Sequence, residues 1–191
     1  MKTTLRRGNW HRLRWPAIIG LIAASAIGSA WATGWRFNTT PSEPLGLYRL
    51  TAVTEQTEIH RGDLISFCPP VALYPFMVHG GCPNGGAPFL KTVVGVPGDV
   101  VDVSSAGVSI NGRLLPQSRV IVHPKAWPGL TLPATFGVHR LAAGTYWVYG
   151  AGDPRVSFDS RNWGVVKRDR MIAVAPGWLR LRRCGSDRPC R

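Results

Sequence analysis

The sequence predicts an all-β domain, folded as a sandwich or an irregular barrel, behind one N-terminal transmembrane helix. Three observations support this fold class. Short runs rich in β-branched and aromatic residues recur after residue 36, and turn residues separate them. Asn111-Gly112, between two such runs, is a strong hairpin signal. Before these runs, residues 16–34 carry no charge.

The length of 191 residues suits one such domain. The stretch 116–142 is rich in Pro and Gly and is expected to form an elaborated loop or a hairpin insertion. Strands are expected at residues 63–67, 89–96, 100–103, 108–110, 119–122, 145–149, 171–174 and 178–181.

The N-terminal segment has the charge pattern of a membrane anchor. Residues 1–15 hold five basic residues and no acidic one, which predicts a cytoplasmic segment. Residues 16–35 are expected to be a transmembrane anchor or a signal peptide, since 19 uncharged residues just span a hydrocarbon core of about 30 Å. Ala30-Trp31-Ala32 fits a signal-peptide cleavage site and keeps the second alternative open. Residues 36–191 are then an extracytoplasmic domain in either case.

Charge and cysteine content fit an envelope protein. The 23 basic residues outnumber the 10 acidic ones, but they gather mainly at the two ends and accompany no nucleic-acid-binding motif. We therefore expect attraction to anionic lipid headgroups and no nucleic-acid partner. Four cysteines allow three pairings, of which Cys68–Cys82 with Cys184–Cys190 closes the smallest loops. A zinc site is the weaker alternative because no C-x-x-C spacing occurs.

Two segments carry residues suited to nucleophilic catalysis. Ser42 lies in a turn that Pro41, Pro44 and Gly46 make rigid and non-helical, so the turn can display its hydroxyl. Lys91 lies within an apolar β-run, where burial would lower its pKa and let the neutral amine accept a proton. Taken singly, each has an ordinary structural explanation, a plain turn or a snorkelling lysine.

A third segment, residues 153–164, contains an Asp159-Ser160-Arg161 sequence that predicts a salt bridge. The four histidines after residue 36 lie outside all three segments and are expected to be surface or loop residues. With no histidine near the aspartates, no metal or organic cofactor is expected.

In this order the three segments resemble the bacterial type I signal peptidases. The resemblance rests on Lys-x-x-x-Gly-x-Pro-Gly-Asp, which begins at Lys91, and on Asp159-Ser-Arg161-x-Trp-Gly. The serine segment has Ser42-Glu43-Pro44 where housekeeping enzymes have Ser-x-x-Pro, and its form is similar to the TraF branch involved in conjugative transfer. Cys68 and Cys82 also match that branch. The resemblance covers roughly residues 36–177 and implies a signal-peptidase-like fold.

The resemblance also implies the roles of the site residues. Ser42 would be the nucleophile and Lys91 the general base. Thr40 would offer its hydroxyl to the oxyanion hole, and Ser157 would orient the Lys91 amine. Asp159 and Arg161 would form the supporting salt bridge.

The expected function is that of a serine endopeptidase at the inner membrane with a periplasmic catalytic domain. Its expected partner is a polypeptide, namely a prepilin that it would mature, with cyclisation as an alternative outcome, for conjugative pilus assembly. A general type I signal peptidase and a non-enzymatic envelope or pilus-assembly scaffold are the alternatives.

Overall fold

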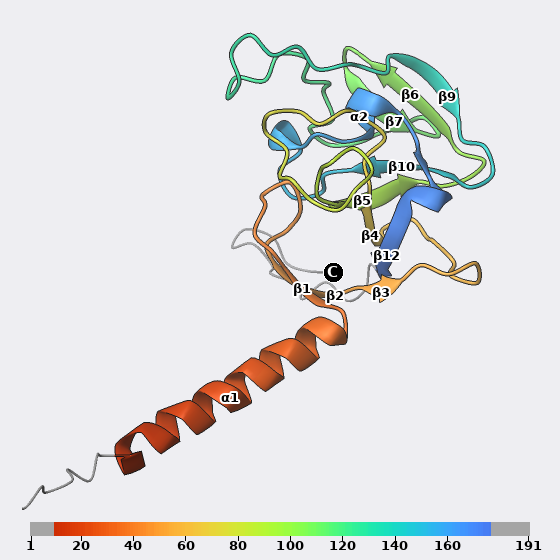
Figure 1. Cartoon of the computed structure of the whole chain (residues 1–191). Helices are drawn as coiled ribbons and strands as arrows, with labels where there is room; N and C mark the ends of the chain where they lie inside the picture. The colour runs from red at the N-terminus through yellow and green to blue at the C-terminus, as the bar shows by residue number, and fades with distance from the viewer. Residues whose placement is uncertain (1–9, 177–191) are drawn as a thin grey trace, which may run out of the picture. The chain divides into compact units, whose positions relative to one another are not determined.

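The computed structural model describes residues 10–176 and divides the chain into two compact units, before and after the Trp35–Arg36 bond. In the first unit, helix α1 spans Trp10–Ala32 (Figure 1). Residues 15–32 of this helix have a mean hydropathy of 1.5, and none of that window is buried. The helix is long and apolar enough to be a candidate membrane span. It begins six residues before the uncharged run, so Pro16 lies inside it.

The second unit is all-β apart from short helical turns, as the sequence predicts (Figure 1). Its largest sheet has six strands in the order β11-β10-β5-β4-β12-β3, and a second sheet has the order β8-β7-β6-β9. Strand pairs in these two sheets are antiparallel. β1 and β2 form a separate two-stranded sheet. The strands are β1 (Trp35–Asn38), β2 (Gly46–Arg49), β3 (Thr51–Ala52), β4 (Leu64–Phe67), β5 (Phe89–Gly95), β6 (Val100–Ser104), β7 (Gly107–Ile110), β8 (Arg113–Leu114), β9 (Gly137–Arg140), β10 (Thr145–Tyr149), β11 (Val166–Lys167) and β12 (Met171–Ala175).

Strand β5 is an interior strand, which explains how a lysine comes to be buried. It pairs with β4 on one side and β10 on the other, with Lys91 opposite Ile65. Three consecutive β5 residues, Lys91 to Val93, are buried, so both faces of the strand are covered here. The core beside it includes Ile65, Phe67, Val93 and Val148. A lysine at this position cannot reach bulk water in the way an edge-strand lysine can.

The Asn111-Gly112 hairpin is present between β7 and β8. Ile110 pairs with Arg113, and both turn residues have positive φ angles, 50° for Asn111 and 80° for Gly112. These angles are characteristic of the type I′ turn, which favours Asn-Gly. The Asn111 side chain adds hydrogen bonds to Asp99 and to the backbone N–H of Val100.

The expected strand at residues 119–122 is wrong. Here the backbone carbonyl groups are bound by other partners: the Arg161 guanidinium donates to Arg119, the Asn162 side chain to Ile121, and the Leu132 N–H to Val122. The segment thus satisfies its acceptors without a strand ladder. Five strands were missed, namely β1, β2, β3, β9 and β11; β9 lies inside the expected loop 116–142. Residues 178–181 lie outside the described part of the chain.

A disulfide joins Cys68 to Cys82, as expected, and closes a loop between β4 and β5. Within the loop, Tyr74 and Phe76 stack on each other and pack edge-to-face on Phe158. The loop therefore helps to fix the segment that follows β10. Cys184 and Cys190 lie outside the described residues, so their pairing stays a prediction.

Candidate active site

The turn that carries Ser42, residues 39–45 between β1 and β2, is called the serine turn. It is held from inside by Asn38, at the end of β1. The buried Asn38 amide group donates hydrogen bonds to the carbonyl groups of Thr40, Glu43 and Pro44, at 3.0–3.1 Å. Its oxygen accepts from the N–H and the hydroxyl of Thr40. Prolines at 41 and 44 restrict the backbone further. Ser42 thus lies on a rigid turn whose shape depends on one side chain.

A second segment, residues 150–153, packs directly on this turn. Gly152 N–H donates to the Ser42 carbonyl at 3.1 Å, and Asp153 N–H donates to the Pro41 carbonyl at 2.7 Å. A Cβ atom on Gly152 would lie 2.4 Å from the Pro41 oxygen, and one on Gly150 would lie 2.8 Å from the Ser42 oxygen. Such an approach of two backbones requires glycine.

Strand β5 brings Lys91 to the serine. Lys91 Nζ lies 2.8 Å from Ser42 Oγ, and also 3.2 Å from the Leu90 carbonyl oxygen. Both side chains are buried, with residue exposures of 5% for Lys91 and 9% for Ser42. The same 2.8 Å hydrogen bond can form when the amine is neutral, with the serine hydroxyl as the donor.

Burial lowers the pKa of Lys91 from its usual value, and the positive charge of Arg161 lowers it further. The carboxylates of Glu43 and Asp159 oppose this shift because they favour the ammonium form. A lysine with a lowered pKa supplies neutral amine at a pH nearer to neutrality. This is the property that a general base for a serine hydroxyl needs.

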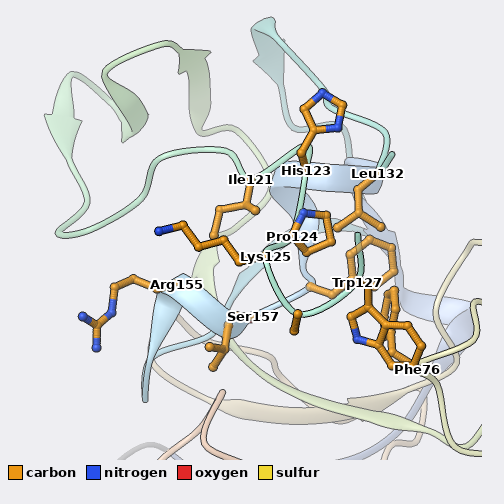
Figure 2. Close-up of a pocket in the computed structure, with 12 residues that line it drawn as sticks. Phe76, Ile121, His123, Pro124, Lys125, Trp127, Leu132, Arg155 and Ser157 are labelled. Carbon is orange, nitrogen blue, oxygen red and sulfur yellow. The ribbon is translucent and has the colours of Figure 1, made fainter. Parts of the chain in front are cut away.

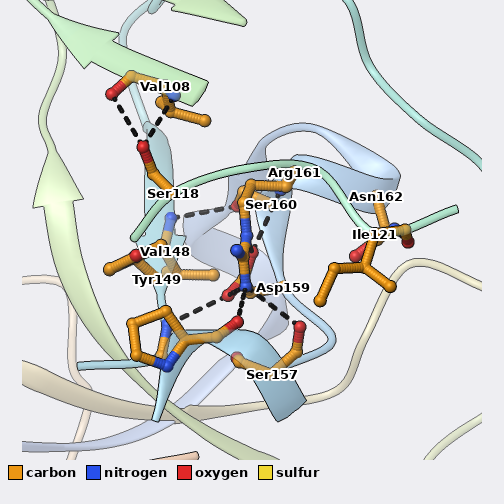
Figure 3. Close-up of polar contacts among 12 residues, drawn as sticks. Val108, Ser118, Ile121, Val148, Tyr149, Ser157, Asp159, Ser160, Arg161 and Asn162 are labelled. Carbon is orange, nitrogen blue, oxygen red and sulfur yellow. Dashed lines mark hydrogen bonds and ion pairs between the residues drawn. The ribbon is translucent and has the colours of Figure 1, made fainter. Parts of the chain in front are cut away.

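Asp159 and Arg161 form the expected ion pair, 2.8 Å long and almost completely buried (Figure 3). The Arg161 guanidinium also donates to the carbonyl groups of Pro154 and Ser157 and lies 4.9 Å from the centre of the Tyr149 ring. Asp159 accepts from the N–H of Gly150. The pair therefore ties the segment after β10 to the glycines that pack on the serine turn.

Ser157 does not make the hydrogen bond to Lys91 that the sequence predicts. Its buried Oγ has no hydrogen-bond partner in the structure. A Cβ atom built on Gly150 would lie 2.1 Å from this Oγ, so the hydroxyl fills the space that a side chain at Gly150 would need. The Lys91 amine is held instead by Ser42 and Leu90.

Thr40, expected in the oxyanion hole, is exposed and donates its hydroxyl to Asn38 Oδ1 at 2.8 Å. The bond uses the only proton that the Thr40 hydroxyl can offer. An oxyanion contact from Thr40 therefore requires that this bond to Asn38 opens, and the role stays a prediction.

Comparison with known proteins places this chain in a family. A family model described as signal peptidase, peptidase S26, matches residues 9–178. The chain belongs to the S26 signal peptidase family. A probable conjugal transfer protein TraF of Sinorhizobium fredii is 35% identical, over 91% of this chain and 92% of the relative. A plasmid transfer protein TraF of Escherichia coli is 34% identical, over 84% of this chain and 92% of the relative.

More distant matches are signal peptidases in the narrower sense. A probable signal peptidase I-2 of Synechocystis is 30% identical, over 60% of this chain and 45% of that protein. The crystal structure of a signal peptidase I from Enterococcus faecalis is 22% identical, with a TM-score of 0.35, over 60% of this chain and 94% of that one. The S26 family supports serine peptidase chemistry and a polypeptide substrate for this chain.

Two residues of this S26 peptidase site were missed by sequence reasoning. Neither Asn38 nor Glu43 belongs to a sequence pattern that predicts a role for it. The Glu43 carboxylate accepts hydrogen bonds from Thr92 and Ala151, which are 49 and 108 residues away. The only local signal is an acidic residue within a proline-rich turn, which gives no indication of such distant partners.

A pocket of about 720 Å³ adjoins the site (Figure 2). Ser157 lines it and also packs on Gly150, beside the Ser42 carbonyl. Lys125 and Arg155 extend to one side of the pocket, while Phe76 and Trp127 lie at the other. No acidic residue belongs to this lining, which is otherwise mostly apolar. Such a surface suits apolar side chains of a polypeptide.

The chain offers a matched test of the buried ion pair. Arg161→Met should lower the free energy of unfolding by about 3–5 kcal/mol, because it leaves the Asp159 carboxylate buried without its cation. Arg155→Met breaks an ion pair of the same Asp-x-Arg spacing, Asp153–Arg155, whose arginine side chain is 73% exposed. It should cost far less. Urea denaturation measures both, and equal losses would contradict the structural role of Arg161.

Proposed function

We propose that this S26 family member is a serine endopeptidase in which Ser42 is the nucleophile and Lys91 is the general base. The 2.8 Å contact between Ser42 Oγ and Lys91 Nζ, inside a buried site, is the observation that carries this proposal. The lowered pKa of Lys91 supports it, because only the neutral amine can take the hydroxyl proton.

In the proposed reaction Lys91 accepts the proton as Ser42 Oγ bonds to the carbonyl carbon of the scissile peptide. The resulting oxyanion would be stabilised by the Ser42 N–H and, once it is released from Asn38, by the Thr40 hydroxyl. The Lys91 ammonium then gives its proton to the leaving amine as the C–N bond breaks. Attack on the acyl-enzyme, by water or by a second amine, completes the reaction through the same base.

The proposed substrate is a pilin precursor used in conjugation. This rests on the relatives, several of which are named conjugal or plasmid transfer proteins and match this chain over most of their length. If an amine at the other end of the pilin attacks the acyl-enzyme, the product is a cyclic pilin. The dyad permits this outcome because water and amines are activated by the same general base.

We also propose that residues 1–15 are cytoplasmic, that residues 16–35 form an anchor or signal peptide, and that residues 36–191 are periplasmic. The apolar helix and the positive charge before it support this orientation. The Cys68–Cys82 disulfide supports an oxidising compartment.

Protease added to spheroplasts should degrade the domain after residue 36 and spare a tag placed before Met1. Protection of the domain would contradict the orientation.

The dyad itself predicts a sharp pattern of variants. Ser42→Ala should abolish cleavage, and Lys91→Ala should reduce its rate by about 10²–10⁴-fold. Lys91→Arg should fail as well, because a guanidinium group does not lose its proton in a protein. Cleavage by the wild type should increase with pH through the lowered pKa of Lys91, because the ammonium form, which predominates below it, is inactive. Cleavage of a precursor peptide by detergent-solubilised protein measures the rates of the three variants and the pH dependence of the wild type.

Two controls keep this prediction specific. Lys167→Arg makes the same change at an exposed lysine and should keep the full rate. Replacing His60, His79, His123 and His139 together should leave a substantial fraction of activity in a folded protein. A Lys91→Arg variant with a near-normal rate, or a folded histidine-free variant with none, would overturn the Ser–Lys mechanism.

A further inference from the structure

Glu43, the residue after the proposed nucleophile, is an acidic residue that is only 1% exposed. Its two carboxylate oxygens bind two other segments of the domain. One oxygen accepts from the Thr92 N–H at 2.8 Å and from the Ala151 N–H at 3.2 Å. The other accepts from the Thr92 hydroxyl at 2.9 Å. A carboxylate with three donors satisfies its buried oxygens well.

These partners are next to the residues on which the dyad depends. Thr92 follows Lys91 on β5, and Ala151 lies between Gly150 and Gly152, which pack on the serine turn. One side chain thus joins all three segments of the site. Burying a carboxylate without such partners would cost several kcal/mol. A glutamate at this buried position is therefore tolerated only because the three donors bind it.

Glu43 also belongs to the set of charges that act on Lys91. That set contains Glu43 from the serine turn, and Asp159 and Arg161 from the segment after β10. Asp159 and Arg161 pair with each other. Because their charges are opposite, Asp159 raises the pKa of Lys91 and Arg161 lowers it. The ring of Phe89, 5.6 Å from Lys91 Nζ, is the neighbouring aromatic group. Within residues 10–176, Glu43 is thus the acidic member of this set that is not paired with an arginine.

We propose that Glu43 is a positioning residue with two separable effects on the dyad. Its hydrogen bonds hold Ser42 against Lys91, and its negative charge sets the pH at which Lys91 becomes a base. The inference rests on the proposed Ser42–Lys91 function and adds a third residue to it.

Two substitutions separate these effects. Glu43→Gln keeps the shape and can keep all three contacts, because its oxygen accepts from the two N–H groups and its NH₂ donates to the Thr92 hydroxyl. Only the charge is lost. Without that charge the ammonium form of Lys91 is less favoured, so its pKa should fall and cleavage should begin at a lower pH. Glu43→Ala loses charge and contacts together.

The pH dependence of cleavage tests the proposal in the full chain in detergent micelles. In Glu43→Gln the acid limb of the profile should move to lower pH, with the plateau rate largely kept. In Glu43→Ala the plateau should fall about tenfold or more, because the nucleophile is misplaced. Glu55→Gln, at an exposed glutamate, is the matched control and should leave the profile unchanged. A purely structural role would lower the plateau in Glu43→Ala, keep it in Glu43→Gln, and leave the acid limb unmoved in both variants.

A direct titration of Lys91 separates this inference from the dyad itself. The chain has four lysines, so lysine labelled with ¹³C at Cε gives few NMR signals, and Lys91→Arg identifies the one from Lys91. Its pKa should be lower in Glu43→Gln than in the wild type. An unchanged pKa would overturn the role of the charge. A lowered pKa without a moved acid limb would instead support the coupling and contradict Lys91 as the base.

Discussion

The site depends on a buried amine in the middle of a β-sheet. Lys91 lies on β5, between β4 and β10, and its Nζ contacts Ser42 Oγ. An isolated ammonium group at such a position is strongly disfavoured, and the simplest relief is loss of its proton. The cost of burying the charge is therefore what gives the lysine its proposed chemical use. An edge strand would leave the amine hydrated and a poor base at neutral pH.

Three segments distant in sequence must meet around this amine. Asn38 shapes the serine turn from β1, Thr92 continues β5, and the Asp159–Arg161 pair holds the segment after β10. Gly150 and Gly152 allow that segment to touch the turn at distances that no Cβ atom would permit. Because each contact is buried, a displacement of any one segment would change the 2.8 Å contact between Ser42 Oγ and Lys91 Nζ.

Sequence patterns predicted the parts of the fold that local chemistry determines. The Asn111-Gly112 turn, the long apolar run of β5 and the Cys68–Cys82 pairing all follow from nearby residues. The strand predicted at residues 119–122 is absent because the Arg161 and Asn162 side chains, about 40 residues away, bind the carbonyl groups of this segment. Short strands such as β3 and β11 have only two residues and carry no detectable period.

The same division applies to the site. Ser42 and Lys91 could be proposed because the three segments together resemble the signal peptidases, although each segment alone has an ordinary structural explanation. Glu43 could not, since its importance arises from partners on β5 and in the 150–153 segment. The hydrogen bond expected from Ser157 is absent because its hydroxyl fits over Gly150, a packing detail that sequence spacing does not encode.

In the proposed mechanism Lys91 activates Ser42 for covalent catalysis. Its most direct test is mass spectrometry of the acid-quenched protein during a single turnover with a precursor peptide, across a range of pH. If Lys91 is the base, an acyl group should form on Ser42, should form faster as pH rises, and should not accumulate at a comparable rate in folded Lys91→Ala. An acyl group on another residue, or acylation of Ser42 at the same rate without Lys91, would contradict it.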